Sequence, residues 1–290
     1  MPNVLSFGEI LWDLFPDYKK PGGSPANLAY HLHVLGNKTD LISAVGDDEN
    51  GHELLDFIKT KRLPTNHIQI LPEQPTGTVD VVFHDGEPSY TINEPAAWDY
   101  IESSQGLNEL VKSADAICYA SLSQRSEVSE QTLLKILETT KASALKVFDL
   151  NLREPFINKE AIINQINSSD VIKFNEDELK KVSSWFNTED LPGYLIEKNP
   201  NVCLLITLGA KGSTLINTSG SYSQKAFPIT GEGDFVGVGD AFLACATHLL
   251  LKQRSSNEVL LKANRYAGFI ASQKGGMPDV PDNIIEAVNS

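Results

Sequence analysis

Hydrophobic and polar positions follow an alternating pattern in the first sixty residues that is typical of an α/β protein. Short, mainly apolar runs at residues 4–7 and 39–45 predict buried strands. Each run is followed by a segment whose apolar residues recur three and four positions apart, at residues 24–35 and 52–61. This spacing predicts helices with one buried face. The order strand, helix, strand, helix implies a parallel sheet covered by helices.

The hydrophobic period changes between residues 76 and 92. Residues 76–83 alternate between apolar and polar positions, Asp85-Gly86 is a hairpin turn signal, and residues 89–92 continue the strand pattern. The mainly apolar run at residues 10–15 is expected to join this antiparallel ribbon. We therefore expect one domain spanning residues 1–290, with a small inserted sheet acting as a lid and formed by about residues 10–20 and 72–100. A decorative or dimerising hairpin is the alternative, and a hairpin can serve both as a lid and in a dimer.

The α/β alternation resumes after residue 114. Strands are predicted at residues 115–119, 146–149, 171–174 and 202–207, and helices at residues 126–140 and 256–274. Polar loops follow these strands, at residues 121–125, 151–153, 175–178 and 208–212. Ligands of open α/β sheets bind beyond the carboxyl ends of the strands. The convergence of polar loops at that edge predicts a ligand site there.

Two glycine-rich stretches, each leading into a helix, carry the candidate chemistry. Residues 230–240 form a polar loop dense in glycine, and the apolar residues 241–251 predict the helix that follows. A helix N-terminus behind such a loop can bind an anion, and Asp240 could take a proton from an attacking hydroxyl. A plain turn with Asp240 as helix cap is the alternative. Residues 21–27 open the other helix, with Ser24 as predicted N-cap and Asn27 in the first turn.

Charge and composition restrict the class of partner. The net charge of −14 argues against a nucleic-acid or anionic-membrane partner, and implies that a bound nucleotide would need a divalent cation. The apolar run at residues 241–251 is too short to span a bilayer. The first residues lack the features of a secretory signal, and three separated cysteines suit a reducing compartment, so we expect a cytoplasmic protein.

With these segments placed, the whole chain resembles the PfkB (ribokinase-like) carbohydrate kinases. Residues 22–27, followed by Gly36 and Gly46, match the N-terminal pattern of the family, and residues 234–240 look like its C-terminal D-T-x-G-A-G-D motif. Similarity to bacterial fructokinases extends to residues 8–13, 95–99, 121–125 and 148–153. The resemblance implies a ribokinase-like three-layer α/β/α fold with a mostly parallel central sheet and a small β-sheet lid. It also implies phosphoryl transfer from ATP to a furanose sugar, for which we expect D-fructose.

The resemblance also implies roles for individual residues. Asp240 would be the catalytic base, and the backbone N–H groups of Gly237, Val238 and Gly239 would form the anion hole. Asp13, Gly23 and Asn27 would hold sugar hydroxyls, with Gln124 and Arg125 nearby. Trp98 would pack against the ligand or seal the base of the lid. Asn175, Glu178, Thr207, Gly209, Gly212 and Asn264 would bind MgATP, with Glu178 reaching Mg²⁺ through water. Arg153 would stabilise an anion or a loop, and Asp234 would help to bind a monovalent cation such as K⁺.

The chain departs from the family motif at two positions. Phe235 replaces a threonine, which removes a hydroxyl near the phosphates, and Val238 replaces a small residue within the anion hole. The other functions kept open are a kinase for another sugar or nucleoside, such as ribose or ketogluconate, and a sugar-binding descendant without activity. The exposed sheet of the lid is expected to pair with a second subunit in a homodimer.

Overall fold

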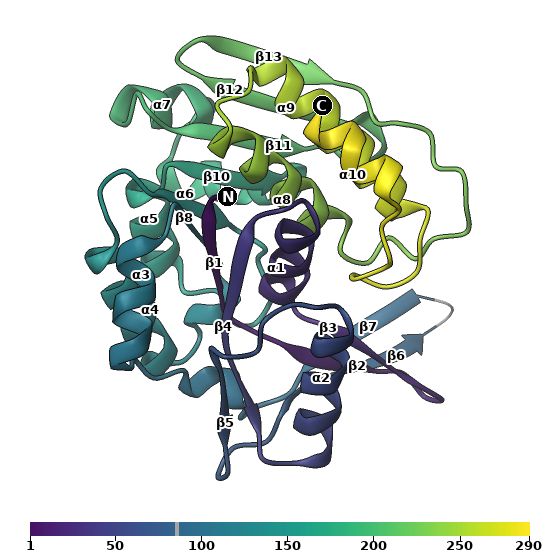
Figure 1. The fold of residues 1–290 in the computed structure, drawn as a ribbon. Coiled ribbons are helices and arrows are strands. Elements are labelled where there is room, and N and C mark those ends of the chain that lie inside the picture. The colour runs from purple at the N-terminus through teal and green to yellow at the C-terminus, as the bar shows by residue number, and fades with distance from the viewer. Residues whose placement is uncertain (85–86) are drawn as a thin grey trace.

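A computed structural model describes residues 1–84 and 87–290, and a nine-stranded sheet forms the centre of this part of the chain (Figure 1). Its strands are β1 (Asn3–Phe7), β4 (Lys38–Gly46), β5 (Ile68–Leu71), β8 (Ala116–Ala120), β9 (Leu145–Asp149), β10 (Val171–Asn175), β11 (Cys203–Thr207), β12 (Ser213–Asn217) and β13 (Gly220–Gln224). Their order is β13-β12-β11-β10-β9-β8-β1-β4-β5. All pairs from β11 to β5 are parallel, whereas β12 and β13 add in antiparallel fashion.

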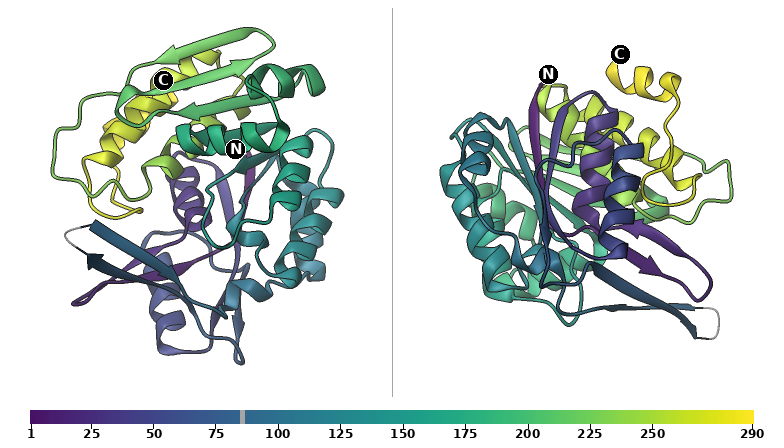
Figure 2. Two further views of the ribbon diagram at one scale, coloured as in Figure 1. Left: turned by 180° about the vertical axis from the view of Figure 1, so that it is seen from behind. Right: turned by 60° about the horizontal axis from the view of Figure 1, so that its bottom comes forward.

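Helices cover both faces of this sheet and make a three-layer structure (Figures 1 and 2). One face carries α3 (Gln105–Ser113), α4 (Glu127–Thr139), α5 (Lys159–Ser168), α6 (Glu176–Phe186) and α7 (Leu191–Lys198). The other carries α1 (Ser24–Val34), α2 (Glu49–Thr60), α8 (Val238–Leu251), α9 (Ser256–Ala271) and α10 (Asp282–Asn289). Short helical turns are η1 (Ala97–Tyr100), η2 (Leu122–Gln124) and η3 (Gly209–Lys211). The layers confirm the predicted fold class.

The period of two along a strand explains why both faces have an apolar core. On β1, Leu5 and Phe7 belong to the core under α3–α7, whereas Val4, the residue before Leu5, belongs to the core under α1 and α8. Successive side chains of a strand point to opposite faces, so a strand buried on both sides is apolar throughout. The short continuous apolar runs of the sequence are therefore the central strands.

A second, four-stranded sheet projects from one edge of the three layers (Figures 1 and 2). It has the order β3 (Lys19–Gly22), β2 (Leu11–Leu14), β6 (Gly77–His84), β7 (Glu87–Ile92). β2 does join the hairpin, but parallel to β6, so the sheet is mixed rather than wholly antiparallel. The predicted turn at Asp85-Gly86 lies outside the described residues. We call this sheet the lid sheet.

The strand order changes direction between β1 and β8. From β1 the chain adds β4 and β5 on one side, and it then returns to add β8 through β11 on the other. The carboxyl ends of β1 and β8 therefore adjoin, and the lid sheet is inserted after β1 and after β5. A crevice at such a switch point is the usual ligand site of an open α/β sheet.

The sequence-based prediction did not include several short strands and helices. β3, β5 and β13 each have only four or five residues, and helices α3, α5 and α7 are also short.

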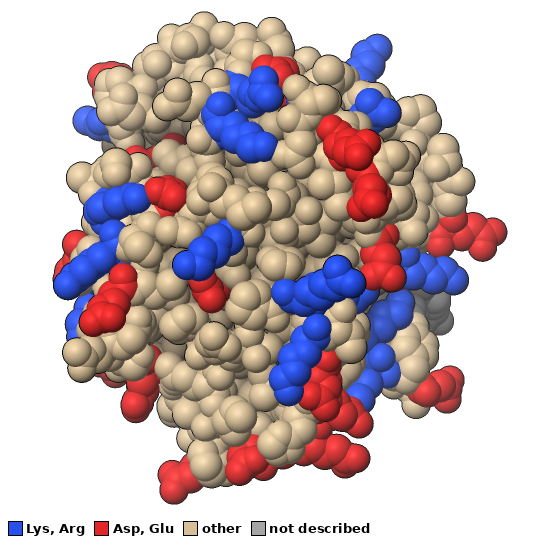
Figure 3. Space-filling model, in the orientation of Figure 1, with Lys and Arg blue, Asp and Glu red and all other residues tan. Residues whose placement is uncertain are grey.

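None of the helices in the described ranges is long and apolar enough to cross a membrane. On the face drawn in Figure 3, basic and acidic side chains of the described residues are interspersed and do not form a continuous basic surface.

Candidate functional site

The N-terminus of α8 has the geometry of an anion site. Gly237 precedes the helix with φ 72°, and no side chain caps this end. A Cβ at Gly237 would lie 2.7 Å from the Cα of Gly276, so both the positive φ and the close approach require glycine. Val238, Gly239 and Asp240 form the first turn. Their backbone N–H groups lack intrahelical acceptors and lie at the positive end of the helix dipole.

The structure brings Asp240 together with the start of α1. Asp240 accepts hydrogen bonds from the Ser24 hydroxyl at 2.7 Å and from the Asn27 amide nitrogen at 2.8 Å. More than 200 residues separate these partners in sequence. Burial and the neighbouring Asp149 raise the pKa of Asp240, although the two hydrogen bonds oppose that shift. Asp240 is therefore oriented, and a carboxylate with a raised pKa is a better proton acceptor.

Ser24 does not have its predicted role as helix cap. Gly23 is the N-cap of α1 and Ser24 the first helical residue, so its hydroxyl is available to Asp240. Gly23 has φ 103°, and a Cβ there would lie 2.4 Å from the backbone oxygen of Glu9. The prediction treated Ser24 as a local cap because sequence alone does not show the contact with α8.

A cavity of about 570 Å³ lies between the lid sheet and the starts of α1 and α8. We call it the polar cavity. Its polar lining side chains are Glu9, Asp13, Ser24, Asn27, Asn151, Arg153, Asp234 and Asp240, and Gly23 and Gly237 contribute backbone. Tyr90, Val79 and Ile92 of the lid sheet cover it. Of the predicted sugar-binding residues, Asp13, Gly23 and Asn27 therefore lie at one cavity.

Two further carboxyl groups of the polar cavity have perturbed acidity. Burial raises the pKa of Glu9 to about 7, against hydrogen bonds from its own backbone and from Ser123. Burial also raises the pKa of Asp13 to about 6, opposed by the charges of Lys20 and Arg153. Glu9 was absent from the predicted site, although a glutamate directly after a buried strand could have indicated it. Both carboxyl groups can accept hydroxyl hydrogen bonds in this cavity.

Trp98, Gln124 and Arg125 lie outside the lining of the polar cavity, in the core below the lid sheet. Trp98 is 1% exposed, and the guanidinium of Arg125 lies 3.9 Å from the centre of its ring. Arg125 donates two hydrogen bonds to Asp99, each of 2.7 Å. The positions of Trp98, Gln124 and Arg125 therefore do not support the predicted contact with the sugar. Trp98 lies against β6, where a Cβ at Gly77 would be 2.4 Å from its indole nitrogen, and this position is compatible with its alternative role at the base of the lid.

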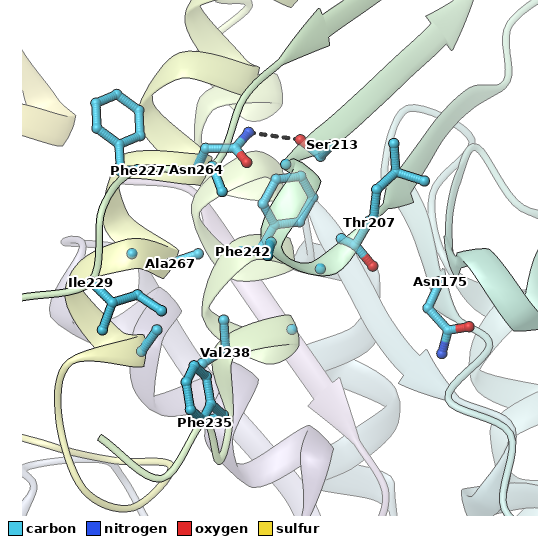
Figure 4. A pocket seen from close by; sticks show the side chains of 18 of the residues that line it. Asn175, Thr207, Ser213, Phe227, Ile229, Phe235, Val238, Phe242, Asn264 and Ala267 are labelled. Atoms are coloured by element: carbon cyan, nitrogen blue, oxygen red, sulfur yellow. Dashed lines mark hydrogen bonds between the residues drawn. The ribbon is translucent and has the colours of Figure 1, made fainter. Parts of the chain in front are cut away.

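A second cavity, of about 520 Å³, lies on the other side of the start of α8 (Figure 4). We call it the apolar cavity. Much of its lining is apolar, with Ala226, Phe227, Ile229, Phe242, Ala267 and Ala271. Five of the six residues predicted to bind MgATP line it, namely Asn175, Thr207, Gly209, Gly212 and Asn264, whereas Glu178 does not. Asn264 donates a hydrogen bond of 2.7 Å to the Ser213 hydroxyl, which fixes its amide at the wall (Figure 4).

The two cavities meet at the first turn of α8. Val238 and Gly239 line the apolar cavity, whereas Gly237 and Asp240 line the polar one. Phe235 lines both, with φ 60° and 62% of its surface exposed. A group held in one cavity could thus reach a group held in the other across the helix N-terminus.

A buried ion pair lies under this meeting point. Lys173 Nζ donates a hydrogen bond of 2.7 Å to Asp149, and both side chains are more than nine-tenths buried. A Cβ at Gly239 would lie 3.6 Å from Lys173 Nζ, so the ammonium group adjoins the first turn of α8. Burial alone would lower the pKa of Lys173, but Asp149 and Glu178 hold it above the ordinary value. The prediction overlooked Lys173, whose signal was a lysine within an apolar strand.

The predicted magnesium residues form the start of α6. Asn175 caps the helix, while the Glu178 carboxylate accepts hydrogen bonds from the backbone N–H groups of Asn175 and Leu152. Residues 1–84 and 87–290 contain no group of three or more His, Cys, Asp or Glu side chains suited to a metal. Mg²⁺ in phosphoryl-transfer sites is usually held by one or two carboxylates, waters and substrate phosphates. Asn175, Glu176 and Asp177 line the apolar cavity and offer oxygen ligands for that weaker mode of binding, whereas both carboxylate oxygens of Glu178 already accept backbone hydrogen bonds.

The predicted cation residue Asp234 is surrounded by donors. Its carboxylate accepts hydrogen bonds from Lys20 Nζ at 2.8 Å, from the N–H of Gly275 at 3.0 Å and from the N–H of Val236 at 3.2 Å. These donors take up most of the roughly four lone-pair positions of the carboxylate, and the Lys20 ammonium group already supplies a positive charge beside it. This arrangement does not fit a monovalent cation bound by Asp234.

Known proteins were compared with the chain, and a model of the pfkB family carbohydrate kinases matches residues 4–283. Fructokinase-2 from Solanum lycopersicum is 30% identical, covering 96% of this chain and 93% of that protein. The structure of a fructokinase with bound ATP from Xylella fastidiosa is 20% identical with a TM-score of 0.86, covering 99% and 97% of the two chains. The ATP complex of sugar kinase PH1459 from Pyrococcus horikoshii is 25% identical with a TM-score of 0.83, covering 99% of each. The chain belongs to the pfkB family of carbohydrate kinases and has the ribokinase-like fold.

Proposed function

We propose that this carbohydrate kinase transfers the γ-phosphoryl group of MgATP to a hydroxyl of a furanose sugar, with D-fructose as the preferred acceptor. The observation that carries the proposal is the meeting of two cavities of different character at the N-terminus of α8. The apolar cavity suits an adenine ring and the polar cavity a polyol. The helix N-terminus between them suits the transferring phosphate.

In the proposed reaction, the sugar hydroxyl oxygen attacks the γ-phosphorus while the bond from that phosphorus to the ADP oxygen breaks. Asp240 accepts the hydroxyl proton on a carboxylate oxygen. Ser24 and Asn27 hold the carboxylate in place, and the N–H groups of Gly237, Val238 and Gly239 bind the phosphoryl oxygens. Such a reaction depends on positioning and charge neutralisation more than on covalent chemistry.

Mg²⁺ would supply positive charge to the phosphates when bound. Asn175 and Glu178 are the residues proposed to reach it through water. Thr207, Gly209, Gly212 and Asn264 would contact the nucleotide. A lid sheet over the polar cavity would exclude water, which protects ATP from hydrolysis while the sugar is bound.

The charges of the polar cavity favour a neutral sugar. Glu9, Asp13, Asp234 and Asp240 bring four carboxyl groups to the cavity lining, against one guanidinium, that of Arg153. A sugar acid would bring a further negative charge close to these groups. Asp13, Gly23 and Asn27 are the residues proposed to hold hydroxyls of D-fructose.

A panel of acceptors tests the proposal. ADP release would be measured with MgATP and D-fructose, D-ribose or 2-keto-3-deoxygluconate, and the Asp240→Asn variant would be the control. We expect the largest kcat/KM for D-fructose. If D-ribose or the sugar acid gave a larger kcat/KM, that acceptor and not D-fructose would be the preferred substrate. Sugar binding by calorimetry without ADP release from any acceptor would favour the binding-only alternative, for which Phe235 at the meeting of the cavities is the structural reason.

We also propose that the lid sheet mediates a homodimer. Tyr18 and Val82 of this region are 53% and 48% exposed, which leaves apolar surface for a second copy. Light scattering of the native chain and of Val82→Lys would test it. We expect a dimer that dissociates in the variant, and a monomeric native chain would contradict the proposal.

A further inference from the structure

The ion pair between Lys20 and Asp234 joins the lid sheet to the loop that enters α8. Lys20 lies on β3, whereas Asp234 lies three residues before Gly237, the N-cap of the predicted anion site. Their side chains approach to 2.8 Å and are about one quarter exposed, at 28% and 25%. A contact over 214 positions in sequence therefore ties a strand over the polar cavity to the phosphate-binding end of the molecule.

The Lys20 ammonium group is held from several directions. It lies 5.5 Å from the ring centres of Phe15 and of Tyr18, which stack on each other at 4.5 Å. These distances fall within the range of cation–π attraction. In the lid sheet Lys20 is paired in register with Asp13, whose carboxyl lines the polar cavity. The ammonium group is thus positioned between the sugar side and the phosphate side of the site.

The carboxylate of Asp234 accepts hydrogen bonds on both of its oxygens. Burial alone would raise the pKa of Asp234, but hydrogen bonds from Lys20, Gly275 and Val236 bring it below the ordinary value. The hydrogen bond to Asp234 in turn raises the pKa of Lys20, so the pair is charged at neutral pH. An unpaired carboxylate beside an anion site would repel the phosphates, and the ammonium group removes that repulsion.

We propose that Lys20 occupies the place of a monovalent cation beside Asp234 and acts as a positioning residue, so that the kinase works without K⁺. The inference rests on the proposed function only for its rate measurement. Lys20 neutralises Asp234 and holds the loop before α8, and it does so from the lid sheet. A strand that covers the sugar thereby orders the anion hole.

Lys19 on the same strand provides a matched control. Its ammonium group contacts Glu53 and lies 2.8 Å from the Asn50 side-chain oxygen, and it lies 4.7 Å from the centre of the Trp12 ring. These partners belong to α2 and the lid sheet, away from the predicted anion hole. Lys19→Met therefore removes one lysine charge from β3 without touching Asp234.

The first measurement needs no turnover. Thermal unfolding of the native chain would be compared in KCl and in choline chloride at equal concentration. We expect the same Tm in both salts. In Lys20→Ala, which vacates the ammonium position, we expect Tm to be higher in KCl. A K⁺-specific rise in the native chain, or none in Lys20→Ala, would overturn the assignment of Lys20 to a cation position.

The second measurement is the rate with MgATP and the best acceptor. We expect equal kcat for the native chain in the two salts. Loss of a hydrogen bond between charged groups predicts a fall in kcat of roughly 10- to 100-fold for Lys20→Met. Lys20→Arg should retain most of the rate, and Lys19→Met all of it. Equal rates for Lys20→Met and Lys19→Met would remove the positioning role. If no acceptor is phosphorylated, the proposed function fails while the thermal comparison still decides the cation position.

Discussion

The two cavities on either side of the start of α8 are similar in volume and different in chemistry. The polar cavity, of about 570 Å³, brings four carboxyl groups with shifted pKa values together, from Glu9, Asp13, Asp234 and Asp240. The apolar cavity, of about 520 Å³, has a wall rich in alanine and phenylalanine side chains, with Ile229, Leu208 and Val238 beside them. One is built to orient hydroxyl groups, whereas the other is built to accept a flat apolar surface.

The difference reflects how each cavity is assembled. The lid sheet and α1 supply much of the lining of the polar cavity. All of its lining residues lie at or before Arg153, except those from 234 to 240. The apolar cavity is built entirely from residues between Asn175 and Ala271. The groups that we propose to react thus meet where these two parts of the chain adjoin. Substitutions should therefore separate into effects on one ligand, on the other, or on the boundary.

The largest expected effect is on the boundary residue Asp240. Asp240→Asn keeps the shape of the side chain but cannot accept the hydroxyl proton. General-base removal predicts a fall in kcat of about 10²- to 10⁴-fold, measured with saturating MgATP and D-fructose. Tm should change little in comparison, since Asn can still bond to Ser24. Turnover near the native value would show that another group accepts the proton.

The buried pair below the boundary should matter most for stability. Lys173→Met leaves the Asp149 carboxylate buried without its partner, and the free energy of unfolding should fall by about 3–5 kcal/mol in urea titrations. Lys146→Met, at a half-buried lysine of the neighbouring strand, is the control. Adding Asp149→Leu to Lys173→Met should restore much of the loss. Equal urea midpoints for the two lysine variants would contradict this role.

A pair of substitutions tests whether the two cavities act separately. Asp13→Asn removes the charge from a predicted hydroxyl acceptor, so KM for the sugar should rise roughly tenfold while KM for ATP stays constant. Ala267→Leu adds volume at the wall of the apolar cavity. It should raise KM for ATP and leave KM for the sugar unchanged. Parallel changes of both constants in either variant would show that the cavities are coupled.

Sequence reasoning succeeded where a local pattern decides the structure. Glycine-rich loops before apolar helices predicted the starts of α1 and α8, and uniformly apolar runs predicted the central strands. Most residues predicted for the nucleotide, including Thr207 and Asn264 but not Glu178, lie at one cavity, because they end a strand, follow one or face the same edge of the sheet.

The prediction failed where a side chain's role depends on a partner distant in sequence. Ser24 reads as a helix cap, but it contacts Asp240. Arg125 lies in a polar loop after β8, where a ligand contact is expected, yet Asp99 and Trp98 hold it in the core. Asp234 resembles a cation ligand until Lys20 is placed beside it. Ion pairs between distant segments leave no periodic signal in the sequence.

The smallest expected effect concerns the acidity of the polar cavity. The pKa of Glu9 is about 7 in the folded protein against an ordinary 4.5, so the folded chain holds this proton more tightly than the unfolded chain. The contribution of Glu9 to the free energy of unfolding is therefore greatest below pH 4.5, and it declines as the pH rises towards 7. Glu9→Gln removes the cost of ionising this buried group. The variant should gain a few degrees in Tm relative to the native chain at pH 8, and less at pH 5.

Thermal unfolding at the two pH values would measure this gain. Glu73→Gln, in an exposed turn, removes the same charge without burial and should show no such dependence on pH. Nothing comparable is expected from the apolar cavity, because the carboxyl residues in its wall, Glu176 and Asp177, are not buried. If the Tm difference between Glu9→Gln and the native chain were the same at pH 5 and pH 8, Glu9 would be ionised in the folded protein at both. The polar cavity would then hold more negative charge, and its distinction from the apolar cavity would rest on polarity alone.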